Sequence, residues 1–435
     1  MTNTNHPSTR RERIAWCMYD FANSGYTTVI LTALFNTYFI AVVAKDIDAD
    51  NSGTATLLWT ITMAVANGLV LICAPILGAI ADYSAAKKKF LIVSTFGCVV
   101  FTASLYFVGP GDVVLGMCLV MLATVMFSAG ENFIAAFLPE LVEPEHMGRL
   151  SGQGWTVGYI GGLITLGICF GYVLWAQGQQ HAASDYIPVT NLIVAVIFLL
   201  AALPTILWLK ERATVNKKLP ISGYIKIGFS RLRETLQHSH HYQDMMRFLL
   251  VLTVYSAGIV TVIVLAGVYA QEVMGFKTNE TLLLILVVNI TAAAGAFAFS
   301  QFQDRIGSKN AVAISLVIWI LAITTAYFSV EVWTFWLAAN LIGVAMGASQ
   351  SAGRALVGQF APPARSGEFF GLWGLALKLA AIIGPLTYGG VNYLFDGDHR
   401  TAILSTLVFF TLGLLALFSV NEQRGRQASK IDHWT

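Results

Sequence analysis

The chain has 435 residues, of which 56% are hydrophobic and only 11% are charged, and its formal net charge is +2. A soluble domain carries roughly 25% charged residues. A chain with so few charges could not cover a surface exposed to water. The composition therefore excludes an ordinary soluble protein, predicts an all-α integral membrane protein, and gives no reason to expect a nucleic-acid partner.

The chain opens on a polar segment that contains Arg10, Arg11 and Arg13 and leads into an apolar run too long for a cleaved signal peptide. A helix needs roughly 20 apolar residues to cross a bilayer. By this criterion the sequence predicts twelve transmembrane helices: Ile14–Val43, Thr56–Ala81, Phe90–Val108, Val113–Leu138, Leu150–Ala176, Ile187–Leu209, Met246–Ala270, Thr281–Phe302, Ala311–Val330, Val332–Phe360, Phe369–Leu394 and Thr401–Val420.

Lysine and arginine residues predict the orientation of these helices, because they are enriched on the cytoplasmic side. If the N-terminus is cytoplasmic, most of the 26 lysines and arginines lie inside, and only Lys45, Lys277 and Arg400 lie outside. We therefore expect both termini in the cytoplasm and, for so compact a chain, a bacterial inner membrane.

The only long connection separates the sixth and seventh predicted helices. Its apolar residues recur at helical spacing with cations between them, which predicts an amphipathic helix on the membrane surface. The sequence thus predicts an N-terminal six-helix bundle at residues 1–209, a cytoplasmic linker at 210–244, and a C-terminal bundle with a short cytoplasmic tail at 245–435.

A repeated pattern relates the two halves. The stretch GAIADYSAAKKK, from Gly78 to Lys89, follows the second apolar run, and SQFQDRIGSK, from Ser300 to Lys309, follows the eighth. At a common offset Asp82 aligns with Asp304. One copy alone would be explained by a membrane edge, whereas two copies indicate homologous membrane halves, as in many secondary transporters. The pair resembles the loops between helices 2 and 3 and helices 8 and 9 of the major facilitator superfamily, which implies a fold of two six-helix bundles.

The start of the first helix reads Trp16-x-x-Tyr19-Asp20-Phe21-Ala22-Asn23-Ser24. On physical grounds it could be an interfacial aromatic belt with an acid near the helix N-terminus. The pattern also resembles the opening of the vacuole-effluxer (autophagy-type amino-acid exporter) family of this superfamily. The resemblance extends over both halves, through Leu138-Pro139-Glu140, Gly148–Gly162, Gln350-Ser351-x-x-Arg354, Pro362-Pro363, Glu368-Phe369-Phe370-Gly371 and Gly384-Pro385.

One position departs from that family pattern. The resemblance predicts Tyr-Asn-Asp-Gly at the start of the seventh helix, whereas this chain has Tyr255-Ser256-Ala257-Gly258. An acid is therefore missing, which leaves the family's substrate and its ion coupling through that position open for this chain.

Ionisable side chains within membrane helices are costly, so each is a candidate for function. Asp20, Glu131, Arg354 and Lys378 fall in predicted spans. Lys378 lies about 18 Å into its helix, near the midplane, and is a candidate for binding the anionic end of a solute. Glu131 or Asp20 could carry a proton. The alternative is that these residues pair with one another and only hold helices together.

Glu131 and Arg354 lie at similar depth on equivalent helices of the two halves, so we expect them to form a gate across the bundles. Asp82 and Asp304 each end a helix, where a carboxylate can meet a neighbouring helix N-terminus. We expect these two acids to control the conformational switch rather than binding.

Polar and aromatic residues at mid-depth are the remaining candidates for lining the pathway. Asn289 aligns with Asn67 in the repeat, and such a pair is either interhelical glue or part of the central pathway. Trp155 and Tyr159 lie one turn apart on a glycine-rich helix. Together with Lys378, the predicted substrate-binding residues are Asn23, Asn132, Trp155, Tyr159, Asn289 and Gln350.

The sequence contains no nucleotide-binding loop, hydrolase nucleophile or metal cluster, which disfavours an ATP-driven pump and an enzyme. We expect a monomeric transporter without cofactors that moves a small polar solute by alternating access, with coupling to protons as an option. The resemblance implies efflux of amino acids. The alternatives are a drug or lipid exporter of the same fold and a non-transporting membrane receptor or assembly partner.

Overall fold

The computed structural model describes residues 8–45, 54–212, 221–237 and 241–430. Within these residues the protein is helical throughout, and twelve segments are long and apolar enough to cross a membrane. The first segment is α1 (Arg10–Gly25), η1 (Tyr26–Ala33), α2 (Phe35–Tyr38) and η2 (Phe39–Val43). The others are α3 (Thr54–Tyr83), α4 (Lys87–Ser104) with η3 (Leu105–Phe107), α5 (Val113–Ala135) with α6 (Leu138–Leu141), α7 (Met147–Gly178) after η4 (Pro144–His146), α8 (Ala183–Trp208), α10 (Gln243–Glu272), α11 (Thr278–Ile306), α12 (Ser308–Phe328), α13 (Val332–Phe360), α14 (Ser366–Leu394) after η5 (Pro363–Arg365), and α15 (His399–Leu417).

The twelve predicted spans are confirmed, and most of the helices extend beyond their apolar runs. The helix α4 begins at Lys87, ahead of its predicted start at Phe90. A hydropathy criterion ends a span at the first charge, whereas Lys87 continues the helix and is buried. Large apolar side chains such as Leu386 and Phe328 remain exposed along the helices. Such a surface suits hydrocarbon rather than water, so this is an integral membrane protein.

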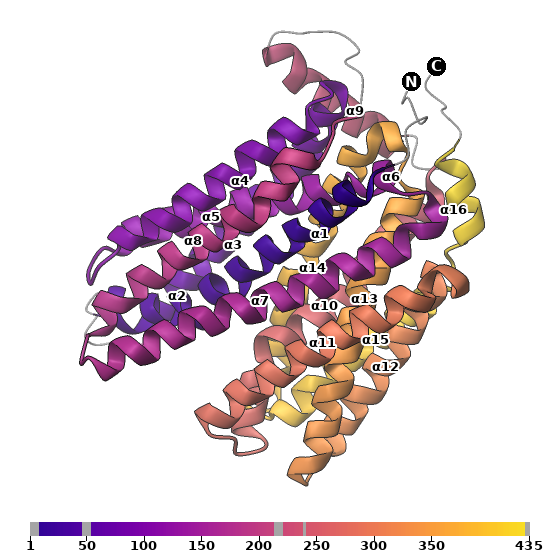
Figure 1. Ribbon diagram of the computed structural model, residues 1–435. Helices are drawn as coiled ribbons and strands as arrows, with labels where there is room; N and C mark the ends of the chain where they lie inside the picture. Colours follow the sequence, from indigo (N-terminus) through magenta and orange to yellow (C-terminus); the bar gives the residue numbers. More distant parts are fainter. Residues whose placement is uncertain (1–7, 46–53, 213–220, 238–240, 431–435) are drawn as a thin grey trace.

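The buried apolar side chains form two clusters that divide the chain in half. One cluster comes from residues 16–209, joined by Ala355, and the other from residues 242–420, joined by Ala135 and Ala136. The helices α1 to α8 therefore form one bundle and α10 to α15 the other. The start of α1 lies on one side of the molecule, together with α6, α9 and α16 (Glu422–Ala428), and the two groups of helices diverge towards the opposite side (Figure 1). We refer to these as the terminal side and the far side.

Glycines allow the two bundles to approach each other closely near the terminal side. A Cβ at Gly78 of α3 would overlap the carbonyl oxygen of Gly367 in α14, and a Cβ at Gly371 would lie 2.6 Å from the Ala74 carbonyl oxygen. The equivalent crossing joins α7 to α11, where a Cβ at Gly152 would lie 2.5 Å from the Ser300 Cβ. Small residues at such crossings let helix backbones meet in a membrane.

The linker between the bundles contains the helix α9 (Ile221–Gln237). Gly228 of α9 packs against Ile76 and Ile80 of α3, and the Arg231 guanidinium lies over the Tyr83 ring at 5.1 Å. On its outer side Phe229 is 56% exposed. The helix therefore rests on the N-terminal bundle at the terminal side.

Candidate functional site

Asp82 joins the bundles by capping a helix of the opposite half. Its carboxylate accepts hydrogen bonds from the backbone amides of Gly367 at 3.0 Å and Glu368 at 2.8 Å, in the first turn of α14. The first amides of a helix have no partner within the helix, and the helix dipole favours an anion there. We call this contact the Asp82 cap.

Lys87 lies beside the Asp82 cap and adds further polar contacts to it. Its ammonium group is 3.6 Å from Asp82, forms an ion pair with Glu140 of α6, and donates to the Ser366 hydroxyl of α14 at 2.8 Å. The Lys87 side chain is 1% exposed. Because these three partners come from three elements and both bundles, separating α3 from α14 would leave a buried ammonium with fewer partners.

Asp304 makes the equivalent contact in the other direction. Its carboxylate accepts from the backbone amide of Arg149 at 3.0 Å, in the first turn of α7, and His146 lies 3.9 Å away. We call this contact the Asp304 cap. Beside it, Gln359 of α13 donates to the Pro144 carbonyl at 2.8 Å. Each bundle thus supplies a carboxylate that caps a helix of the other; the role of the two acids in switching stays a prediction.

Arg354 of α13 binds the opposite bundle through its whole guanidinium group. It makes a bidentate contact with Asp20 of α1, at 3.0 and 2.7 Å, and donates to the hydroxyl and the carbonyl of Ser151 at 3.1 and 3.0 Å. The planar fork of arginine fits a carboxylate in this manner. Arg354 is 3% and Asp20 9% exposed.

The partner of Arg354 corrects one prediction. The sequence predicted a pair with Glu131, because the two residues lie at similar depth in equivalent helices. The ion pair that forms is with Asp20. Alignment of the halves gives the depth of a residue in the membrane. It does not give the neighbouring helix that the residue faces.

The residues around Asp20 explain the pattern at the start of the first helix. Trp16 donates from its indole nitrogen to the Ile134 carbonyl of α5 at 2.7 Å, and its ring lies 4.5 Å from the Arg354 guanidinium. Tyr19 shares a hydrogen bond of 2.9 Å with Thr95 of α4. Trp16 and Tyr19 therefore fix α1 within its own bundle, and Asp20 faces the other bundle from that fixed position.

Two more contacts join α7 to α13 deeper in the molecule. The Ser151 hydroxyl donates to the Ser351 carbonyl at 2.8 Å, and the Tyr159 hydroxyl donates to the side-chain oxygen of Gln350. From Arg149 to Tyr159 the contacts of α7 with the other bundle extend over about 15 Å. They lie in the terminal half of this helix, which continues to Gly178. The described residues thus hold the bundles together on the terminal side.

Glu131 of α5 and Lys378 of α14 are opposite charges contributed by opposite bundles. Each lies within electrostatic range of the other, and Asp20 and Arg354 lie within range of Glu131. Both side chains are half-buried. Among the described residues neither forms an ion pair within 4.0 Å or a side-chain hydrogen bond. Two charges of opposite sign therefore remain available to a third group.

Several buried polar atoms nearby lack hydrogen-bond partners among the described residues. They are the side-chain oxygen of Asn23, the amide nitrogen of Asn132, the indole nitrogen of Trp155 and the hydroxyl of Tyr255. Trp155 lies 5.4 Å from the Arg354 guanidinium, and Asn132 packs against Gly374 of α14. Buried polar groups are usually satisfied, so such atoms indicate water or a ligand.

Asn289 is the predicted site residue that the structure leaves apart from the others. It is half-buried on α11, and its amide donates to the Ile285 carbonyl one turn earlier at 2.8 Å. No contact within the described part of the chain joins it to the charged residues. Its place in the pathway stays a prediction.

Sequence reasoning missed several residues of this region. Lys87 stands in the run of lysines after Asp82 and Glu140 stands in the Leu138-Pro139-Glu140 motif, and neither pattern predicts that together they support the Asp82 cap. Ser151 and Tyr255 were not singled out as candidates. The position of Lys87 beside the repeated acid was the available signal, since the repeat places Lys309 at the equivalent position.

Comparison with solved structures places this fold in a class. The human organic anion transporter MFSD10 (TETRAN) superposes with a TM-score of 0.72 at 16% identity, covering 95% of this chain and 100% of that chain. The proton:xylose symporter XylE, of the major facilitator superfamily, superposes with a TM-score of 0.73 at 14% identity, covering 94% of both chains. The two six-helix bundles thus have the fold of the major facilitator superfamily, as the sequence predicted.

Sequence comparison is more specific. The model of the family "Vacuole effluxer Atg22 like" matches residues 8–430, and the chain belongs to this family. The "Uncharacterized MFS-type transporter YxiO" of Bacillus subtilis is 28% identical over 425 residues, which cover 97% of each protein. "Autophagy-related protein 22-1" of Aspergillus niger is 22% identical over 301 residues, covering 64% of this chain and 48% of that protein. The chain thus spans about half of that fungal relative and nearly all of the bacterial one. It is an MFS-type transporter.

Proposed function

We propose that this protein moves free amino acids across a bacterial plasma membrane by alternating access, in the direction of efflux. The observation that carries the proposal is the pair Glu131 and Lys378. These charges are half-buried, come from opposing bundles and are not joined to each other by a short contact. Burying charged side chains within a membrane is costly, so two such charges without a partner among the described residues indicate a function such as ligand binding.

A free amino acid is complementary to this pair. Its carboxylate would bind the Lys378 ammonium and its own ammonium would bind Glu131, so that both buried charges are paired in one event. The unpartnered atoms of Asn23, Trp155 and Tyr255 supply further donors and acceptors in the same region. Membership in the effluxer family and the near-complete match to a bacterial MFS-type transporter support the direction and the membrane.

Alternating access requires that the terminal side open and close around this site. In the structure the Asp82 cap, the Asp304 cap and the Asp20–Arg354 pair hold it closed. With the termini in the cytoplasm, as the distribution of lysine and arginine favours, this is an outward-facing state. Opening to the cytoplasm would expose Asp20 and Arg354 to water, which replaces their mutual contacts. Protonation of Glu131 or Asp20 is the route by which we propose a proton gradient would bias the cycle.

The proposal is tested by ligand binding to the purified transporter. Thermal unfolding is measured with the proteinogenic amino acids, and then with the methyl ester and the N-acetyl derivative of the best ligand. Lys378→Met should lower affinity for the amino acid but not for the ester, which lacks the carboxylate. Glu131→Gln should lower affinity for the amino acid but not for the N-acetyl form, which lacks the ammonium.

Lys277→Met and Glu331→Gln are matched controls, because both residues are exposed charges outside this region. They should bind like the unmodified protein. If no amino acid shifts the unfolding temperature while apolar drugs or lipids do, the protein is an exporter of apolar compounds and the proposal is wrong. If either variant lost affinity equally for the amino acid and for both derivatives, the assignment of the two charges would also be wrong.

A further inference from the structure

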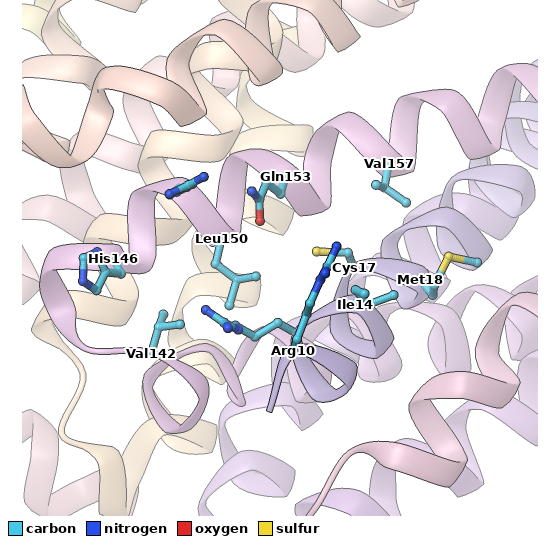
Figure 2. Close-up of a pocket in the computed structure, with 11 residues that line it drawn as sticks. Arg10, Ile14, Cys17, Met18, Val142, His146, Leu150, Gln153 and Val157 are labelled. Carbon is cyan, nitrogen blue, oxygen red and sulfur yellow. The ribbon is translucent and has the colours of Figure 1, made fainter. Parts of the chain in front are cut away.

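A pocket of about 670 Å³ lies outside the interbundle region, between α1 and α7 near the terminal side. Figure 2 shows Arg10 and His146 towards one end of it, and Met18 and Val157 towards the other. Arg13 and Arg149 also line the pocket. Its two ends therefore differ in chemistry, with cations at the terminal side and apolar side chains deeper along the helices.

The pocket opens towards the surrounding membrane. On α7, Gly154, Gly158 and Gly161 face α1, and Gly152 faces α11. Val157 lies at the edge of the contact with α1, half-buried against the N-terminal cluster. Further along α7 lie exposed apolar residues, of which Ile160 is 42%, Ile164 46% and Ile168 49% exposed.

The arginines at the terminal end of the pocket are free to bind a ligand. Arg10 and Arg13 are exposed, and within the described part of the chain neither guanidinium group forms an ion pair or a hydrogen bond. Arg149 binds Asp304 through its backbone, and its side chain is exposed. Arg10 is the first residue of α1, and Met18 lies about 12 Å further along it. This spacing separates a headgroup region from the start of the hydrocarbon.

We propose that this pocket binds one anionic phospholipid from the leaflet on the terminal side. The phosphate and an anionic headgroup contact Arg10, Arg13 and Arg149, and an acyl chain lies along Met18 and Val157 and continues over Ile160 and Ile164. Arginine suits phosphate because its planar fork donates two parallel hydrogen bonds. A water-soluble anion would use the arginines but leave the apolar half of the pocket uncovered, so the lipid accounts for both halves.

Native mass spectrometry of the full-length transporter tests this inference. The protein is exchanged into detergent and titrated with phosphatidylglycerol or phosphatidylcholine of the same acyl chains. We expect one phosphatidylglycerol to be retained at least tenfold more tightly than phosphatidylcholine. Each cation near an anionic headgroup contributes several-fold to affinity, so Arg10→Gln/Arg13→Gln should abolish most of this preference.

Two further variants make the result specific. Lys89→Gln/Arg305→Gln removes the same charge from exposed positions elsewhere on the terminal side and should keep the preference. Val157→Trp keeps every arginine but fills the apolar half, and should weaken binding of both lipids. Because Val157 is half-buried at the edge of α7, this variant is expected to fold and keeps the test decisive if the arginine variant does not.

Three outcomes would overturn the inference. The first is equal retention of the two lipids by the unmodified protein. The second is an equal loss of preference in the Lys89→Gln/Arg305→Gln control, which would indicate only general charge. The third is displacement of the lipid by millimolar inorganic phosphate together with full binding by Val157→Trp, which would indicate a site for free anions.

Discussion

Replacing Arg354 by glutamine should shift the transporter towards the state that is open on the terminal side. Arg354 donates four hydrogen bonds to the opposite bundle, two of them to the Asp20 carboxylate and two to Ser151. In Arg354→Gln the Asp20 carboxylate stays buried without its cation while the terminal side is closed. When that side opens, water hydrates the carboxylate, so the cost falls on the closed state alone.

The magnitude follows from the burial of the pair. Removing one partner of a buried ion pair costs about 3–5 kcal/mol, and Asp20 is 9% exposed, so most of this cost applies here. Taking about 3 kcal/mol, at 1.4 kcal/mol for each factor of ten, the ratio of closed to open molecules should fall by roughly a hundredfold. A population that is nearly all closed would become measurably open.

Distances between spin labels measure this shift. In a background in which the free cysteines Cys17, Cys73, Cys98, Cys118 and Cys169 are replaced, one pair of labels is placed at Lys89 and Asn310 on the terminal side. A second pair is placed at Gln179 and Glu331 on the far side. Arg354→Gln should lengthen the first distance and shorten the second.

Arg424→Gln is the matched control for this measurement. Arg424 also pairs with a carboxylate on the terminal side, but its partner Asp244 belongs to the same bundle. The control should leave both distances as in the unmodified protein. If Arg354→Gln moves the distances no more than Arg424→Gln does, the Asp20–Arg354 pair is a permanent structural contact and the reasoning fails.

Three further predictions concern the switch and the orientation. Asp82→Asn and Asp304→Asn should each slow turnover while the KM for substrate stays within a few-fold, because both cap helices of the opposite bundle away from Lys378; normal turnover in both variants would remove them from the switch. Gly371→Leu should favour the terminal-open state, because its side chain would meet the α3 backbone, and unchanged label distances across the terminal side would argue against a close crossing. With the terminal side in the cytoplasm, a cysteine at Lys277 should react with an impermeant maleimide added to intact cells and one at Arg233 should not; the reverse pattern would invert the topology.

The architecture could be read from the sequence because membrane insertion imposes a simple rule. A span must be apolar over about 20 residues, and each polar interruption marks an end. The repeated acid after the second and eighth helices then related the halves, and it also placed Asp82 and Asp304 at the same side. The structure agrees, with each carboxylate at the N-terminus of a helix from the other bundle.

The pairing of charges was harder to predict, because it depends on helix rotation. Asp20 and Glu131 are both acids within reach of the same region, and only packing decides between them. Trp16 and Tyr19 fix the rotation of α1 through hydrogen bonds to α5 and α4, so that Asp20 faces Arg354. The sequence contains these residues but does not give the partners that set the rotation.

The buried network of Lys87 was missed for a different reason. A lysine at the end of an apolar run is normally solvated, so its burial depends on the approach of a second bundle. Here Gly78 and Gly367 let α3 and α14 meet closely enough that Ser366 and Glu140 surround the ammonium. Contacts between two bundles leave little signal in a single sequence.

Counterflow in proteoliposomes tests the central claim most directly. Vesicles that contain the purified protein are loaded with an unlabelled amino acid, identified by the binding measurement, and diluted into a trace of the labelled form, with and without an imposed proton gradient. The account predicts that label accumulates transiently, that Lys378→Met and Glu131→Gln abolish the accumulation, and that Lys277→Met does not. Accumulation that is equally fast in all of these variants, or no exchange of any amino acid by protein that binds it, would contradict an amino-acid transporter built around Glu131 and Lys378.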